Sequence, residues 1–387
     1  MLTAILLFIV ILSLIVFVHE LGHFLVARKF GVKALEFGFG LPPRAAGIVK
    51  NDEGKWEYVS AKSKKEYKNT ILSLNWIPVG GFVQLKGEAG DEEVIEPDSF
   101  NAKAIWKRIS ILSAGVIMNV IFAAVVLAVG FMVGLPSVIE DLPANARVSD
   151  PHIQVFSVLD GSPADEAGFE AGDIILGVNG VQYTTTEELQ SVIKQNPGTP
   201  IEISILRRGE EMSLLVTPEA LEQAGNVAIG VGLGDVGIVS YPPHVAVLKG
   251  AESTVLLTGA VIYAFYDLFK NIIVHQEVSV DLSGPVGIAV MTGQVARMGL
   301  SYILQFTAVL SINLAIINFL PFPGLDGGRV LFLTIEKIRR KPMPSKVEAA
   351  IHNAGFIALL ALLALVTFRD IAKVSDKIID SFKSLIS

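Results

Sequence analysis

The sequence predicts a multi-pass α-helical membrane protein with about four spans, one extracytoplasmic α+β domain and a small membrane-associated β segment. Two observations indicate this class. Hydrophobic residues make up 51% of the 387 positions, whereas charged residues make up only 18%. Four apolar stretches also reach the length of about 20 residues that is needed to cross a bilayer. These stretches are residues 2–27, 109–135, 302–320 and 350–368.

The distribution of basic residues predicts the orientation of these spans. Lys and Arg number 14 in residues 28–108 and 6 in residues 329–346, whereas residues 136–250 hold 5 of them against 16 Asp and Glu. Cytoplasmic loops are enriched in Lys and Arg. The first two segments are therefore expected inside the cell and residues 136–250 outside. We expect a protein of the cell (inner or cytoplasmic) membrane with both chain termini outside.

Residues 1–30 predict the first transmembrane helix. A signal peptide is the alternative, but the stretch lacks a basic leading region and a small-residue cleavage site. Its apolar run continues directly into the sequence HELGH, residues 19–23. We therefore interpret it as a retained span. The chain contains no cysteine, which excludes disulfide bonds and thiolate metal ligands.

Residues 31–102 predict a β-rich, membrane-associated segment on the cytoplasmic side. Residues 35–43, 55–60 and 71–88 carry aromatic and β-branched residues between Gly and Pro. One interpretation is a small sheet that dips toward the first helix, because strands at membrane depth must pair within the protein. A soluble hairpin loop is the other interpretation. The second transmembrane helix is expected within residues 103–135.

Residues 150–220 predict one small α+β domain outside the membrane. A strand (IQVFSV), a turn with a short helix, a second strand that ends at Asn-Gly, a Thr-capped helix (TTEELQSVIKQN) and a hairpin follow one another. The run GSPADEAGFEAGDIILGVNG resembles the PDZ pattern of bacterial proteins. This resemblance implies a domain that binds an extended peptide or a chain terminus beside a sheet edge. No second copy follows before residue 250.

Residues 245–299 predict an amphipathic, interfacial segment. Three charged residues interrupt its apolar pattern between positions 252 and 270, which favours a helix on the outer membrane surface. A fifth span is the alternative. The third transmembrane helix is expected within residues 300–335, and the fourth within residues 348–370.

The chemistry is concentrated in the first span, where His19, Glu20 and His23 follow an uncharged run. Residues four apart project from one helix face, so the two imidazoles can bind one metal ion. The pattern H-E-x-x-H is typical of zinc sites in which the Glu is the general base that removes a proton from the metal-bound water. A divalent cation also explains ionisable groups within a span, since each is otherwise costly there. A proton relay without metal is the alternative.

A zinc site of this kind needs a third protein ligand, and Asp326 is the strongest remote candidate. It belongs to NFLPFPGLDGG, residues 318–328, where Pro removes backbone donors and Gly permits tight turning. Asn318 is a second polar residue of this motif at membrane depth. The charge count places both motifs on the cytoplasmic side. The simpler interpretation is a loop with turn residues, which does not require an Asp.

HELGH, NFLPFPGLDGG and the single PDZ-like unit between them resemble the site-2 protease family of intramembrane zinc metalloproteases, in its bacterial branch that regulates sigma-factor signalling. Three further segments fit the same family: EFGFG (36–40), IPVGGFVQLKGE (77–88) and GPVGIA (284–289). The resemblance implies cleavage of single-pass membrane proteins, such as anti-sigma factors or signal-peptide remnants, in regulated intramembrane proteolysis.

The resemblance also implies the roles of the site residues. Zn²⁺ would be bound by His19, His23 and Asp326. Glu20 would be the catalytic base, and Asn318 would help to hold the substrate or the transition state.

Two stretches depart from the family pattern. SAGVIMN, residues 113–119, lacks the Pro that usually follows its Gly, although Asn119 is present. Residues 50–70 are longer and more basic than usual. Neither stretch includes a metal motif, so the departures concern the substrate path.

Three classes of function fit these observations. The first is an intramembrane protease, the second a non-catalytic PDZ scaffold with a metal-stabilised bundle, and the third a transporter or proton-linked channel. A scaffold does not require Glu20 beside the metal. A transporter predicts more spans and inverted repeats, which the sequence does not show. The protease is therefore favoured.

The remaining candidates are interpreted as ordinary residues. His152, His244, His275 and His352 have no partners at ligand spacing. The basic run KSKKEYK, residues 62–68, is expected to face solvent or anionic lipid. The expected partners are therefore single-pass substrates, a peptide at the PDZ-like domain and the lipid bilayer, but no nucleic acid.

Overall fold

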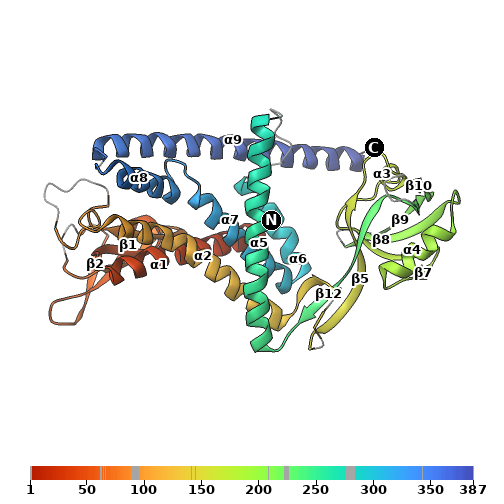
Figure 1. Cartoon of the computed structure of the whole chain (residues 1–387), viewed down its shortest axis with the longest axis horizontal. Coiled ribbons are helices and arrows are strands. Elements are labelled where there is room, and N and C mark those ends of the chain that lie inside the picture. The colour runs from red at the N-terminus through yellow and green to blue at the C-terminus, as the bar shows by residue number, and fades with distance from the viewer. Residues whose placement is uncertain are drawn as a thin grey trace. The chain divides into compact units, whose positions relative to one another are not determined.

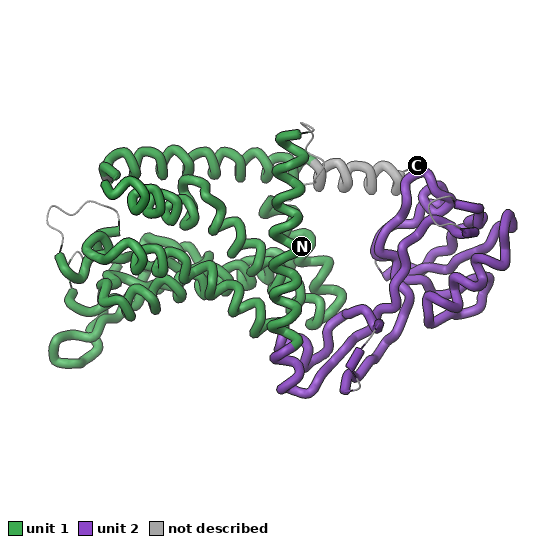
Figure 2. The backbone as a smooth tube through the Cα atoms, viewed as in Figure 1, with its two compact units in different colours: residues 1–127, 249–387 green, residues 128–248 purple. Residues whose placement is uncertain are grey.

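The chain divides into two compact units, one of residues 1–127 with 249–387 and the other of residues 128–248 (Figure 2). The first unit contains the apolar helices and a small sheet, and the second contains a larger sheet (Figure 1). The computed structural model describes all residues except 1, 62, 64, 66, 89–95, 141, 144, 208, 222–225, 275–283, 342 and 387.

Five described helices are long and apolar enough to cross a membrane, judged by length and composition. They are α1 (Leu2–Lys29), α2 (Ile105–Val133), α5 (Pro243–Val274), α7 (Leu300–Phe319) and α9 (Ser345–Ile386). Four of these helices lie at the positions of the four predicted spans. The fifth, α5, falls in the segment expected to be interfacial. The count of about four spans therefore stays a prediction, with α5 as a candidate fifth.

The predicted third span, residues 300–335, forms two helices rather than one. Helix α7 ends at Phe319, and α8 (Asp326–Arg339) begins after a loop of residues 320–325. Prolines in this loop cannot donate the hydrogen bonds that would continue α7. Gly327 allows α8 to start close to the end of α7, because a Cβ there would overlap the Phe319 carbonyl.

Helix α6 (Pro285–Met298) precedes α7 and contains most of the GPVGIA segment. Its first turn has no side-chain cap of its own. The carboxylate of Asp370, from α9, accepts a hydrogen bond from the Gly287 N–H at 2.7 Å. An acceptor at this position satisfies a helix N–H that has no partner within the helix.

The small sheet lies against α1. Its strands are antiparallel in the order β2-β1-β3, namely β2 (Trp56–Ser60), β1 (Ala34–Lys50) and β3 (Ile71–Leu85). Strand β3 bends around β1, so that Phe37 pairs with both Leu72 and Val83. On α1, the Ser13 hydroxyl donates a hydrogen bond to the Pro78 carbonyl at 3.1 Å. The strands thus lie within residues 31–102 and beside the first helix.

The second unit is built on one seven-stranded sheet in the order β4-β12-β5-β6-β8-β9, with β7 paired to β6. Its strands are β4 (Leu135–Val138), β5 (Arg147–Val158), β6 (Ile174–Val178), β7 (Val181–Gln182), β8 (Ile201–Arg207), β9 (Glu210–Val216) and β12 (Val231–Ser240), beside a separate pair β10 (Glu219–Leu221) and β11 (Asn226–Ala228). The predicted range of 150–220 omits β4 and β12, which belong to the same sheet.

Two helices of this unit begin after a capping residue, and the Thr cap of the second was predicted. In α3 (Pro163–Glu166) the Ser162 hydroxyl caps the first turn, and in α4 (Thr186–Gln195) the Thr185 hydroxyl does so. The inner face of α4 buries Leu189 and Ile193 in a core of aliphatic side chains from the sheet. In the same unit, Arg207 donates two hydrogen bonds of 2.7 Å to Asp173. These bonds raise the pKa of the Arg207 guanidinium, so the arginine stays charged.

Candidate active site

Helix α1 brings the two predicted histidine ligands onto one face. The rings of His19 and His23 lie 4.8 Å apart, centre to centre, at an angle of 79°. Their Nε2 atoms are 3.1 Å apart. Both residues are buried, with 4% and 6% of their surface exposed. The helical spacing of four residues is what places these two nitrogens at one point.

Asp326 reaches the same point from the start of α8. Its Oδ2 atom lies 2.9 Å from His19 Nε2 and 3.3 Å from His23 Nε2. The three possible ligand atoms lie within 4.8 Å of one another, and this is the one such group found among the described residues. Two imidazole nitrogens and a carboxylate oxygen are a donor set that zinc accepts, with a fourth position left open for catalysis. The residues therefore fit a zinc ion.

The remaining ring nitrogen of His23 is held by the backbone of α2. Its Nδ1–H donates to the carbonyl of Ile111 at 2.8 Å. This bond places the proton on Nδ1 and leaves Nε2 free to bind a metal.

The ring of His19 also faces α2, where it lies beside Asn119. The Asn119 side-chain nitrogen lies 3.4 Å from His19 Nδ1, and its Oδ1 has no hydrogen-bond partner among the described residues. Turning the amide over would pair Oδ1 with the Nδ1–H that a metal-binding His19 carries. Ser311 of α7 fixes this part of α2 by donating to the Asn119 carbonyl at 2.9 Å. Asn119 thus belongs to the site, although the sequence offered no role for it.

A glycine on α2 makes room for both histidines. A Cβ on Gly115 would overlap the ring of His23 and lie 2.7 Å from His19 Nε2. On α1, Gly22 in turn makes room for α2. A Cβ on Gly22 would lie 2.9 Å from the Cβ of Met118 and would overlap the Ala114 carbonyl. Helices α1 and α2 can therefore cross closely beside the two histidines. The run SAGVIMN contributes Gly115 and Asn119 to this crossing.

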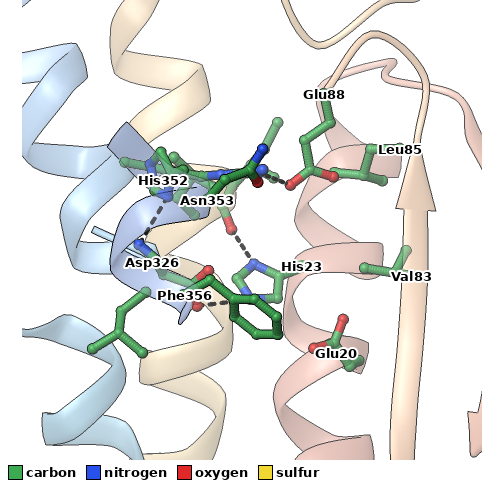
Figure 3. Close-up of a pocket in the computed structure, with 14 residues that line it drawn as sticks. Glu20, His23, Val83, Leu85, Glu88, Asp326, His352, Asn353 and Phe356 are labelled. Carbon is green, nitrogen blue, oxygen red and sulfur yellow. Dashed lines mark hydrogen bonds and ion pairs between the residues drawn. The ribbon is translucent and has the colours of Figure 1, made fainter. Parts of the chain in front are cut away.

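Two members of the ligand group, His23 and Asp326, line a cavity of about 330 Å³ (Figure 3). Figure 3 shows Asp326 reaching toward His23 from the opposite side, with Glu20 beside His23 on α1. Glu20 lines the cavity but is not a member of the ligand group. Asn318, at the end of α7, lies with its Nδ2 atom 3.4 Å from His19 Nε2. All five predicted site residues therefore come together in space.

Several residues of the cavity were not predicted. Val83 and Leu85 come from the end of β3, and Glu88 follows them and forms an ion pair with Arg329 of α8. This pair joins the end of the small sheet to the helix that begins with Asp326. No signal in the sequence connects two charges that are 241 positions apart.

The interpretation of the remaining histidines needs one correction. His352 of α9 lines the cavity together with Asn353 and Phe356, so it is not an ordinary residue. A histidine within an otherwise apolar predicted span was the signal that could have found it. His152 and His244 lie outside this cavity, and His275 lies outside the described residues.

A histidine pair and a remote aspartate that can bind zinc, together with a free glutamate beside them, define a zinc metalloprotease site. Because it stands on helices long enough to cross a bilayer, the protein is a membrane zinc metalloprotease. The chain belongs to peptidase family M50, the site-2 proteases, whose pattern matches residues 7–362. This confirms the family and the zinc cofactor that the motifs implied.

Two relatives illustrate this membership. The regulator of sigma-W protease RasP of Bacillus subtilis is 31% identical over 448 aligned positions, covering 95% of this chain and 97% of that protein. The zinc metalloprotease RasP of Geobacillus kaustophilus is 29% identical, with 95% and 97% covered. Among solved structures, the PDZ domain of an SdrC-like protein of Listeria monocytogenes matches 22% of this chain and 92% of its own, at 24% identity and a TM-score of 0.21.

Proposed function

We propose that this protein hydrolyses peptide bonds in or near the transmembrane segments of single-pass membrane proteins, in regulated intramembrane proteolysis. Anti-sigma factors and signal-peptide remnants are the substrate classes that the resemblance suggests. The observation that carries the proposal is the position of two of the proposed zinc ligands, His19 and His23, within α1, a helix of spanning length that is uncharged before His19. A metalloprotease site at this depth is better suited to membrane-embedded substrates than to soluble ones.

The roles of the residues follow from their positions. His19, His23 and Asp326 would hold zinc, which when bound supplies Lewis acidity toward water and the scissile carbonyl. Glu20 is close to this group without belonging to it, so its carboxylate is free to accept a proton from the attacking water and pass it to the leaving amine. Asn318 has amide hydrogens beside His19 Nε2 and would hold the substrate carbonyl.

The end of β3 offers a place for the substrate backbone. Among the described strands, residues 81–85 pair with β1 on one side only, and Val83 and Leu85 line the cavity. A free strand edge binds an extended chain through backbone hydrogen bonds. Extension of the substrate also matters chemically, since helical hydrogen bonds hide the peptide bond that must be attacked. This supports a bound segment that is unwound from its helix beside β3.

The α+β unit is proposed to recruit substrates outside the membrane. A cavity of about 230 Å³ lies between α4 and residues 226–231, with Leu233 beside it. This is a groove between a helix and a strand, which suits an extended peptide or a chain terminus. The charge distribution supports an extracytoplasmic position for this unit and a cytoplasmic-side position for the active site.

Co-expression with candidate single-pass proteins tests the proposal. The native protein is expected to produce a shortened substrate fragment that stays absent with the Glu20→Gln variant. Mass spectrometry of the fragment locates the cut. A cut within or next to the substrate span supports the proposal, whereas cleavage only in remote soluble loops contradicts it.

A further inference from the structure

The loop that delivers Asp326 is held by α9. The Gly324 N–H donates a hydrogen bond to Nδ1 of His352 at 2.9 Å. A backbone N–H can only donate, so Nδ1 must be the acceptor and the proton of the neutral ring is on Nε2. That Nε2 is buried without a hydrogen-bond partner among the described residues. His352 is therefore committed to the loop, and it is not a member of the ligand group.

The shapes of the two segments match this hydrogen bond. Gly355 lies one turn after His352, and a Cβ on it would overlap the carbonyl of Pro323. A Cβ on Gly324 would lie 2.9 Å from the Phe356 nitrogen. The backbone of α9 and the backbone of the loop are thus in direct contact, with no side chain between them. Such a contact leaves the loop little freedom to shift while His352 holds Gly324.

The loop position sets the position of the third ligand. Gly324 is two residues before Asp326, and α8 begins at Asp326 without a side-chain cap from Leu325. The carboxylate is therefore anchored from outside its own helix. Metal ligands must lie within about 0.2 Å of their ideal distances, so a small displacement of the loop would weaken the contacts of Asp326 Oδ2 with both histidines.

We propose that His352 is a positioning residue for the zinc site, acting through the Gly324 N–H to place Asp326. His352 is not one of the three possible metal ligands and does not contact the reacting atoms. This role rests on the proposed assignment of Asp326 as the third zinc ligand, and it does not depend on the substrate class proposed above.

Zinc retention by the purified full-length protein tests this role without any substrate. His352→Leu removes the acceptor, and His352→Asn keeps one, because Oδ1 of Asn occupies the same position along the side chain as Nδ1. Ile351→Ala changes an exposed neighbour on α9 and is the matched control. Each variant is dialysed against a graded zinc chelator, and thermal unfolding of the metal-free protein is recorded in parallel.

The expected result is a zinc affinity about tenfold lower for His352→Leu, in line with the 10- to 100-fold effects of residues behind metal ligands. His352→Asn and Ile351→Ala should stay within about twofold of the native protein, and metal-free unfolding should be unchanged in all three. Gly355→Ala is an independent second variant, because it displaces Pro323 while His352 is intact. The zinc affinity of Gly355→Ala should fall by a similar factor.

Three outcomes would overturn the proposal. The first is native zinc affinity in both His352→Leu and Gly355→Ala. The second is an equal loss in His352→Leu and His352→Asn, which would show that the hydrogen-bond acceptor does not matter. The third is a loss of zinc matched by an equal destabilisation of the metal-free protein, which would make His352 a residue of general packing. If His352→Leu does not accumulate, His352→Ala, which also removes the acceptor, takes its place.

Discussion

The carboxylate of Asp326 lies 2.9 Å from His19 Nε2, although 307 positions separate the two residues in the chain. The contact depends on α8, on the loop before it and on the close crossing of α1 with α2. A metal site assembled in this way responds to substitutions in each of these elements. The predictions below separate zinc binding from chemistry and from substrate selection.

The ligand and base roles predict opposite effects on zinc. Asp326→Ala removes one of the three proposed protein ligands, so zinc content should fall severely and cleavage should be lost. Glu20→Gln removes the proton acceptor but no ligand, so zinc should be retained while cleavage falls at least about a hundredfold. Metal analysis of both purified variants separates these roles. Full zinc content and near-native cleavage in Asp326→Ala would point to a different third ligand.

Gly115 should tolerate no side chain. Gly115→Ala places a methyl group against both imidazoles, so we expect at least a tenfold loss of zinc affinity. Gly259→Ala in α5 is the matched control, because no atom of the described residues outside its own stretch of helix lies within 4 Å of a Cβ there. Both substitutions favour the helix by about 1 kcal/mol. Any loss in the first variant alone is therefore due to overlap. Equal zinc affinity in the two variants would show that α1 and α2 can separate without harm.

The charge distribution predicts sidedness. The chain has no native cysteine, so single cysteines report location without interference. Asp160→Cys lies on an exposed turn of the α+β unit, and Glu53→Cys on an exposed turn between β1 and β2. In intact cells, a membrane-impermeant thiol reagent should label the first and not the second. After lysis both should react. The reverse pattern in intact cells would invert the proposed orientation.

The groove of the α+β unit should affect substrate choice and not the metal. Leu233→Lys places a charge beside the cavity between α4 and residues 226–231, so peptide binding should weaken by tenfold or more. Zinc content should equal that of the native protein, because the ligands belong to the other unit. Peptide binding and the spectrum of cleaved substrates are the measurements. An unchanged substrate spectrum would show that the groove takes no part in substrate recognition.

Much of the fold was accessible from sequence because it depends on short-range patterns. The spacing of His19 and His23 predicts two imidazoles on one helix face, which the structure confirms. Apolar length predicts the spanning helices, and Ser162 and Thr185 begin their helices as capping residues do. Asp326 could be chosen only by elimination, since it was a carboxylate in a turn-rich motif on the expected side.

What the sequence by itself determined about this protein was therefore the ligand types, the membrane class and the order of the elements. Only the tertiary structure decided that β4 and β12 complete the sheet of the α+β unit, that Gly115 makes room for the ligands and that His352 holds Gly324. The physical reason is range. Helical period and capping act over a few residues, whereas these contacts arise where packed backbones meet, between positions that share no local pattern.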